Sequence, residues 1–299
     1  MSITNKIELL GNQISVIIPV YNEAEVIGTV LQQIIASPEL NGAEIIVVDD
    51  GSQDASSKIV ASFPEIHLMS HPFNRGYGAA ICMGSRAATR PYIIWFDSDG
   101  QHRIEDLITV AQKLTSGKFE YCIGVRTDDS HQDKKRLLGK WLLKHAVNFA
   151  LGTNAPDFNS GLRGFQQSIL LQYLHLLPKG FGASTLTTML MIENNHYGVI
   201  QPILVRKRVG KSSVKQLRDG MRTLHIILNI VLLFKPLKFF GWTGFFLILL
   251  GLGYGYIKSF INGLGFPVFA SLLVILGMQS FFFGLIGDQI SALRRERLN

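Results

Sequence analysis

Residues 93–102, an apolar run that stops at two aspartates, read Ile93-Ile94-Trp95-Phe96-Asp97-Ser98-Asp99-Gly100-Gln101-His102. Continuous apolar runs are typical of strands buried in a parallel sheet, and ligands of such sheets bind at the carboxyl ends of the strands. Two carboxylates at such an end can share one hard cation, which takes oxygen ligands and can hold a diphosphate. An Asp-x-Asp also arises by chance about once in ~300 residues, so a solvated loop is the alternative that the rest of the chain must exclude.

Length, charge and cysteine content limit the domain organisation and the binding partners that we expect. The chain has 299 residues, enough for one large domain or two smaller ones, and a net charge of +7 that suits nucleic acid, phosphates or an acidic membrane face. Its two cysteines, Cys82 and Cys122, lie in apolar or small-residue surroundings and suggest packing rather than a disulfide framework. Residues 1–13 lack a long apolar core, so we expect no signal peptide.

Strands and helices alternate along the first half of the chain. Apolar runs predict strands at residues 14–20, 44–48, 66–69, 92–96 and 121–125. Helices are expected at residues 24–37 with Asn22 as N-cap, after Asp54 as N-cap, after Gly76, and at residues 104–114. The alternation predicts an α/β fold with a mainly parallel sheet.

Polar residues follow the predicted strands in turn. Tyr21 and Glu23, Asp49 and Asp50, Asn74 and Arg75, then Asp97 and Asp99 come after the first four strands. We expect them along one edge of the sheet, where a nucleotide binds. The chain has neither the Gly-x-Gly-x-x-Gly of dinucleotide-binding folds after its first strand nor the Gly-x-x-x-x-Gly-Lys-Ser/Thr of P-loop proteins.

Four motifs resemble family 2 glycosyltransferases of the GT-A fold, and most of all the polyprenyl-phosphate hexose transferases, which include the dolichyl-phosphate mannose and glucose synthases. They are residues 16–23, 47–52, 74–76 and 97–102, within a resemblance that covers roughly residues 15–236. The resemblance implies a nucleotide site made of Pro19, Tyr21, Glu23, Asp50, Gly51, Asn74, Arg75 and Ser98. It also implies Mg²⁺ or Mn²⁺ on the diphosphate, held by Asp97, Asp99 and Gln101. Ser98 replaces the Ala that is common in the family, which leaves the sugar nucleotide open.

A basic stretch follows the fifth predicted strand. Lysine and arginine at residues 134–144 alternate with leucines and Trp141, which predicts a cationic amphipathic helix suited to a bilayer interface; an ordinary surface helix fits equally. The family resemblance implies that Arg126, which closes the strand, grips a phosphate near the membrane. It also makes Asp157 a base or a sugar-hydroxyl acceptor, with a loop cap as the alternative.

Residues 180–187 contain no acid, although many relatives carry a Glu-Asp pair there that deprotonates a hydroxyl acceptor. A hydroxyl needs such a base, whereas a phosphate monoester, with a second pKa of about 6, is largely ionised at neutral pH. A phosphate acceptor needs positive charge instead, and residues 206–213 supply it. In the family, a motif like Arg208 to Ser212, here with Lys211, helps to secure the phosphates; a solvated basic turn is the alternative.

The last third of the chain predicts a membrane protein. Residues 214–233 have the pattern of an amphipathic helix that lies on the headgroups. Residues 239–256 carry no charge and span roughly 27 Å as a helix, and residues 267–287 form a second uncharged run after a polar turn at 258–265. Arginines at 294, 295 and 297 favour a cytoplasmic tail. Glycines in the first run permit close helix contact and a homo-oligomer.

We therefore expect a cytoplasmic GT-A domain at residues 1–212, a juxtamembrane amphipathic helix at 213–236 and two transmembrane helices at 237–299, with both termini cytoplasmic at the plasma or inner membrane. The expected reaction moves a hexose, with inversion, from a nucleotide sugar of the UDP-glucose or GDP-mannose type to undecaprenyl or dolichyl phosphate. Alternatives are a processive polysaccharide synthase, which usually carries Gln-x-x-Arg-Trp, and a non-catalytic nucleotide-sugar-binding membrane protein. No nucleic-acid motif is present, so nucleic acid is not an expected partner.

Overall fold

The computed structural model describes residues 10–127, 145, 148, 160–180, 182–206, 228–229, 231–263 and 265–296. The chain forms two compact units, Met1–Leu137 with Asn154–Val214, and Leu138–Thr153 with Lys215–Asn299. The predicted helix at 134–144, most of the predicted helix at 214–233, and the candidate residues Asp157, Arg208 and Lys211 lie outside the described residues.

The first unit is built on a seven-stranded sheet in the order β3-β2-β1-β4-β6-β5-β7. Its strands are β1 (Ile14–Val20), β2 (Glu44–Asp49), β3 (Ile66–Ser70), β4 (Tyr92–Trp95), β5 (Tyr121–Arg126), β6 (Arg163–Gln166) and β7 (Gly198–Ile203). Every pairing is parallel except the two that β6 makes with β4 and β5. The mainly parallel α/β fold is confirmed. The antiparallel strand β6 was not predicted, because Arg-Gly-Phe-Gln is no apolar run.

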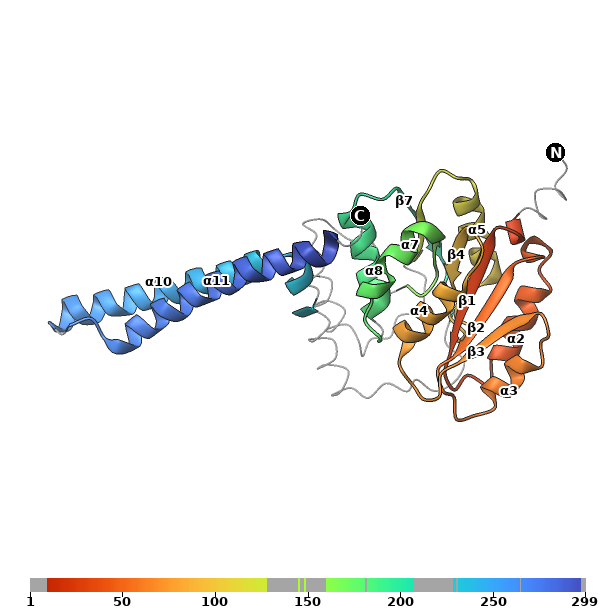
Figure 1. The fold of residues 1–299 in the computed structure, drawn as a ribbon, viewed down its shortest axis with the longest axis horizontal. Helices are drawn as coiled ribbons and strands as arrows, with labels where there is room; N and C mark the ends of the chain where they lie inside the picture. The colour runs from red at the N-terminus through yellow and green to blue at the C-terminus, as the bar shows by residue number, and fades with distance from the viewer. Residues whose placement is uncertain are drawn as a thin grey trace. The chain divides into compact units, whose positions relative to one another are not determined.

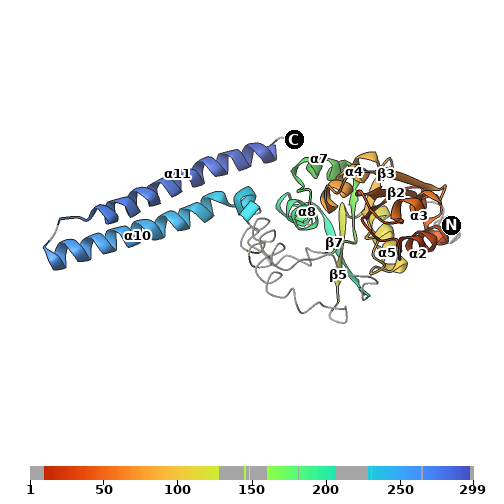
Figure 2. The same ribbon diagram turned by 90° about the horizontal axis from the view of Figure 1, so that it is seen from below.

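Helices cover both faces of this sheet (Figure 1). They are α2 (Ile27–Ile35), α3 (Ser56–Ala61), α4 (Tyr77–Ala87), α5 (Ile104–Thr115), α7 (Gln167–Tyr173) and α8 (Gly182–Glu193), with 3₁₀ turns η1 (Pro38–Leu40) and η3 (Leu174–Leu176). Figure 2 shows α4 and α7 on one side of the sheet and α2 and α5 on the other.

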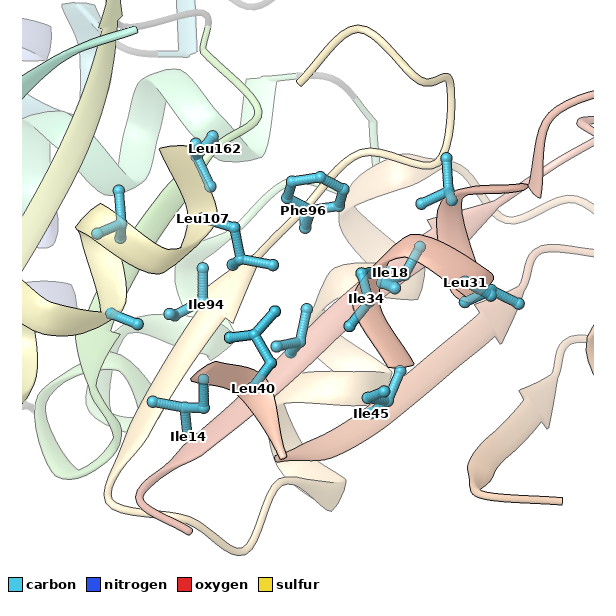
Figure 3. Close-up of a cluster of buried hydrophobic side chains, with 14 of the residues drawn as sticks. Ile14, Ile18, Leu31, Ile34, Leu40, Ile45, Ile94, Phe96, Leu107 and Leu162 are labelled. Atoms are coloured by element: carbon cyan, nitrogen blue, oxygen red, sulfur yellow. The ribbon is translucent and has the colours of Figure 1, made fainter. Parts of the chain in front are cut away.

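Side-chain alternation in β1 explains this two-sided packing. Val16 and Ile18 belong to a buried cluster that also contains side chains of α2 and α5; Figure 3 shows Ile18 in it. Ile17, one residue out of phase, faces α4, where a Cβ on Gly84 would lie 2.5 Å from its side chain. Because strand residues alternate between faces, a central strand that is buried throughout requires a helical layer on each side.

Neither of the two predicted N-cap residues occupies the N-cap position of its helix. Helix α2 begins at Ile27, not at residue 24, and Asn22 does not cap it. Asn22 has a φ of 54° and its Oδ1 accepts the N–H of Gln53, so it joins the loops after β1 and β2. Ala55, not Asp54, is the N-cap residue of α3, although Asp54 Oδ1 accepts the N–H of Ser56, the first residue of that helix, at 2.9 Å.

The described part of the second unit is dominated by a helical hairpin of α10 (Pro236–Asn262) and α11 (Val268–Glu296). Both helices are long and apolar enough to cross a membrane, and most of their side chains are exposed. A Cβ on Gly244 would lie 2.6 Å from the carbonyl oxygen of Gly277, so small residues set the helix spacing. The polar turn expected from Lys258 is wrong, because α10 continues to Asn262 and ends at Gly263 with a φ of 61°.

Candidate active site

The carboxyl ends of β1, β2 and β4 are joined by hydrogen bonds. The hydroxyl of Ser98 is buried and donates to the carbonyl oxygen of Pro19 at 2.8 Å. The N–H of Asp50 donates to the carbonyl oxygen of Val20 at 2.8 Å. The structure thus brings the predicted nucleotide residues of these strands to one edge, and the Ser98 hydroxyl has a protein partner there.

Asp50 shapes the loop that follows β3. Its carboxylate is 3% exposed and accepts hydrogen bonds from His71 Nδ1 at 2.7 Å, from the N–H of Arg75 at 2.9 Å and from the N–H of Gly76 at 2.7 Å. A Cβ on Gly51 would lie 2.7 Å from the backbone of the same loop. Asp50 and Gly51 therefore hold the backbone of the loop on which Asn74 and Arg75 are exposed. Direct contact between Asp50 and a nucleoside stays a prediction.

Tyr21 and Glu23 follow β1 at the same edge. The Tyr21 side chain is 36% exposed. The N–H of Glu23 donates to Ser56 Oγ at 2.8 Å, which fixes the backbone beside α3. Both lie where the parallel strands end, and their contacts with a nucleotide stay predictions.

Asp97, the first aspartate of the Asp-x-Asp loop (residues 97–101), is enclosed by three other segments. The hydroxyl of Tyr77, at the start of α4, donates to Asp97 Oδ1 at 3.1 Å. Nε2 of the buried His102 lies 3.7 Å from Asp97 Oδ2. A Cβ on Gly161, just before β6, would lie 1.7 Å from the same oxygen. The Asp97 carboxylate is therefore closely packed against the backbone of Gly161, which leaves no room for a side chain there.

Electrostatics keep Asp97 ionised. Burial by itself raises its pKa, but the nearby His102 imidazole, the Tyr77 hydroxyl and the charge of Arg126 outweigh burial and lower the pKa below its usual value. Burial and the charge of Asp97 raise the pKa of Tyr77 far above its usual value, so this hydroxyl stays protonated and remains a donor. Arg126, predicted at the end of β5, thus acts on the same carboxylate.

A buried arginine, Arg163, lies close enough to Tyr77 for its charge to act on that hydroxyl. Arg163 is fully buried, and its guanidinium donates to the carbonyl oxygens of Ser160 and Ser184 and, at 3.0 Å, to Thr188 Oγ1. Burial raises the pKa of Tyr77 more than the charge of Arg163 and the Ser184 hydroxyl lower it, so the net shift is upward. Ser184 and Thr188 belong to α8, the helix without an acid in its first turns.

Sequence reasoning missed Tyr77, His102 and Arg163 as parts of the site. His102 ends the motif at residues 97–102 that carries the family resemblance, so its position in that motif was the available signal, whereas Arg163 lies outside the four motifs. Tyr77 stands between two glycines at a helix start, and nothing in that pattern indicates a donor to Asp97.

The rest of the Asp-x-Asp loop contacts the chain beyond β7. Asp99 Oδ1 accepts the N–H of Gln101 at 3.1 Å. The side-chain amide of Gln101 donates to the carbonyl oxygen of Arg206 at 3.0 Å, and the N–H of Arg206 donates back to the carbonyl oxygen of Gln101 at 2.9 Å. The first residue of the predicted basic stretch therefore lies against the loop.

The residues fit a hard divalent cation that also binds a substrate. Among the described residues, no three His, Cys, Asp or Glu side chains are grouped to hold a metal by themselves. Asp97, Asp99 and Gln101 offer only oxygens of the kind that Mg²⁺ and Mn²⁺ prefer, and Asp97 is ionised. Mg²⁺ is usually held by one or two carboxylates together with substrate phosphates.

Comparison with known proteins places this geometry in a family. Residues 15–174, more than half of the chain, match glycosyl transferase family 2. The chain belongs to this family. It is therefore a glycosyltransferase, and residues 235–293 of this glycosyltransferase match the GtrB C-terminal hairpin.

Relatives resemble the glycosyltransferase over nearly its whole length. An undecaprenyl-phosphate 4-deoxy-4-formamido-L-arabinose transferase of Pectobacterium carotovorum subsp. carotovorum is 27% identical, over 94% of this chain and 88% of that protein. Glycosyltransferase AglJ of Haloferax volcanii is 24% identical, over 95% of this chain and 96% of that protein. The crystal structure of Mycobacterium tuberculosis glucosyl-3-phosphoglycerate synthase with Mn²⁺, UDP-glucose and phosphoglyceric acid has a TM-score of 0.59 at 18% identity, over 77% of this chain and 83% of that chain, which shows a shared GT-A-like fold.

Gly161→Ala should displace Asp97, because the added methyl would overlap its carboxylate. We expect glycosyl transfer to lose roughly 100-fold in kcat/KM, the order of loss that a 1 Å misplacement causes, and Mn²⁺ binding measured by electron paramagnetic resonance to weaken. Gly180→Ala is the matched control, since a Cβ there meets nothing within 4 Å. Wild-type activity and Mn²⁺ binding in Gly161→Ala would contradict the assigned role of this contact.

Tyr77→Phe should raise the pKa of Asp97, because the hydroxyl that lowers it is lost. Only the ionised carboxylate binds a cation, so Mn²⁺ binding should fail at a higher pH in the variant as the solution is made more acidic. At neutral pH, where the carboxylate is ionised in both proteins, binding should be similar, so the difference should appear only on acidification. Tyr173→Phe, which removes a hydroxyl 2.8 Å from His196 Nε2, is the control. Identical pH profiles for Tyr77→Phe and wild type would refute this role for Tyr77.

Proposed function

We propose that this glycosyltransferase moves a hexose from a nucleotide sugar to a polyprenyl phosphate at a membrane surface. The observation that carries the proposal is the contact of the Asp-x-Asp loop with Arg206, the first residue of a basic stretch. The helical hairpin and the name of the full-length Pectobacterium relative support a lipid acceptor. UDP-glucose and GDP-mannose are the donor types to test.

The acceptor chemistry follows from what α8 lacks. This helix begins Gly-Ala-Ser-Thr-Leu-Thr-Thr, so no carboxylate in its first two turns can take a proton from a hydroxyl. An ionised phosphate oxygen can attack the anomeric carbon without losing a proton. The new bond joins that oxygen to the anomeric carbon, and the bond from this carbon to the nucleoside diphosphate breaks with inversion.

Two groups of residues would offset the negative charge of the phosphates, one by holding a cation and the other by their own positive charge. Asp97, Asp99 and Gln101 would hold Mg²⁺ or Mn²⁺, which supplies positive charge to the departing diphosphate. Arg126, Arg208 and Lys211 would offset the repulsion between the two phosphate groups. Asp157 would accept a hydrogen bond from a sugar hydroxyl. The nucleotide would bind at Pro19, Tyr21, Glu23, Asp50, Gly51, Asn74, Arg75 and Ser98. The hydroxyl of Ser98 would act indirectly, because it holds the ends of β1 and β4 together.

Purified protein should transfer labelled hexose from UDP-glucose or GDP-mannose to undecaprenyl or dolichyl phosphate. We expect the product to vanish on chelation, to return with Mg²⁺ or Mn²⁺, and to fall by at least roughly 100-fold in Asp99→Ala, as when a group acting only in the transition state is lost. Asp128→Ala, outside the Asp-x-Asp loop, serves as an acid-removal control. Undiminished transfer by Asp99→Ala, or nucleotide binding without any transfer, would overturn the proposal, and chain extension on a sugar acceptor would point to a polysaccharide synthase.

We further propose a cytoplasmic catalytic domain at residues 1–212, an interfacial helix at 213–236 and two membrane spans at 237–299, with both termini on the cytoplasmic side. The two membrane-length helices and the arginines that follow residue 293 support this topology. Single cysteines placed at Gly265 and at Ser2, in a background lacking Cys82 and Cys122, should differ in labelling by an impermeant thiol reagent. We expect labelling of intact cells only at position 265, and labelling at position 2 would reverse the topology.

A further inference from the structure

Gln101 uses three of its groups to join separate parts of the first unit. Its N–H donates to Asp99 Oδ1, its carbonyl oxygen accepts the N–H of Arg206, and its side-chain amide donates to the carbonyl oxygen of Arg206. The last two bonds, here called the Gln101–Arg206 clasp, link residues 105 positions apart. A pair of bonds in opposite directions fixes both the position and the orientation of the Arg206 backbone.

The clasp also fixes which end of the Gln101 amide faces Arg206. A carbonyl oxygen can only accept a hydrogen bond, so the amide nitrogen must point at Arg206. The amide oxygen is then directed elsewhere and remains a possible ligand for a cation. Gln101 can therefore hold Arg206 and contribute an oxygen to the cation site at the same time.

Arg206 is placed with its charge available. Val205, the residue before it, is 4% exposed and anchors the chain in the core, whereas Arg206 is exposed. Within the described part of the chain, the Arg206 guanidinium has no acidic partner, since only its backbone is hydrogen bonded. Arg126, at the end of the neighbouring strand β5, pairs in register with Ile203, three residues before Arg206. Two arginines thus stand at the edge that carries the Asp-x-Asp loop.

An arginine beside a carboxylate–cation site suits phosphate oxygens, because its planar guanidinium donates two parallel hydrogen bonds to them. We propose that the Gln101–Arg206 clasp sets the Arg206 guanidinium as a phosphate-binding group beside the Asp-x-Asp loop, with Gln101 as its positioning residue. The proposal rests on the proposed function, because the phosphate belongs either to the donor diphosphate or to the lipid acceptor.

Three variants separate the clasp from the charge and from the cation. Arg206→Gln keeps both backbone bonds and removes the charge. Gln101→Met removes the amide donor together with the amide oxygen, whereas Gln101→Glu removes the donor and keeps an oxygen for the cation. Gln201→Met is the matched control, because the Gln201 amide also donates to a backbone carbonyl, that of Pro202 at 2.9 Å, on the same strand β7.

Hydrogen exchange of the full-length protein tests the clasp directly. Exchange of a peptide that contains residues 204–206 should be faster in both Gln101 variants and unchanged in Arg206→Gln and Gln201→Met. Mn²⁺ binding should weaken in Gln101→Met and be retained in Gln101→Glu. Unchanged exchange at residues 204–206 in both Gln101 variants would overturn the clasp.

Steady-state kinetics identify the phosphate. In Arg206→Gln and both Gln101 variants, one KM should rise roughly ten-fold, the scale of one charge-assisted hydrogen bond. A rise in the KM of the nucleotide sugar assigns the donor diphosphate, and a rise in the KM of the lipid phosphate assigns the acceptor. If both KM values stay within two-fold of wild type in Arg206→Gln, the phosphate role is refuted.

Failure of the proposed function gives a different result. If wild-type protein transfers no sugar to any lipid phosphate, the proposed function fails while the affinity for UDP and for GDP, measured by calorimetry with Mn²⁺, still tests Arg206. A ten-fold weaker affinity in Arg206→Gln would then support a donor-phosphate role. Equal affinity in wild type and variant would overturn the proposal.

Discussion

The site depends on one hydrogen-bonded carboxylate that is kept ionised although the protein partly buries it. Burial alone raises the pKa of Asp97, and a neutral acid has little attraction for a divalent cation. His102, the Tyr77 hydroxyl and the positive charge of Arg126 reverse this tendency. The fully buried Arg163 and Ser184 of helix α8 interact with Tyr77 in turn. The surroundings that keep Asp97 ionised therefore come from α4, β5, β6 and α8.

The sheet explains how these elements meet. Parallel strands bring their carboxyl ends to one edge, so the loops after β1, β2, β3 and β4 lie beside one another without long connections. Hydrogen bonds between strand ends, such as Ser98 to Pro19, then hold the loops at fixed distances. Residues expected to touch a ligand, Asp50 and Ser98 among them, also hold this scaffold together. Substitutions there would therefore alter binding and loop structure together.

The sequence allowed β1 to β5 and the Asp-x-Asp loop to be predicted, but not β6 or β7, because apolar runs and strand-end acids are local signals. It did not allow the environment of Asp97 to be predicted, because Tyr77, Gly161 and Arg126 come from distant segments whose own patterns say nothing about that carboxylate. The Asn22 cap failed for a related reason: the Asn22 side chain bonds Gln53, thirty-one residues away, in preference to its own helix. Strand β6 was not predicted, because a four-residue strand that pairs with β4 and β5 on its two sides needs no apolar run of its own.

Strand β6 runs against its neighbours, so it presents its beginning where they present their ends. Arg163 and Gly164 point to opposite faces, and a Cβ on Gly164 would meet Leu114 of α5 at 2.3 Å. A slip of β6 by one residue against β4 and β5 would exchange these faces and would force the Arg163 guanidinium into the aliphatic layer under α5. The register of β6 is therefore fixed by its own residues, because Arg163 and Gly164 are each accepted on one face of the sheet and excluded from the other.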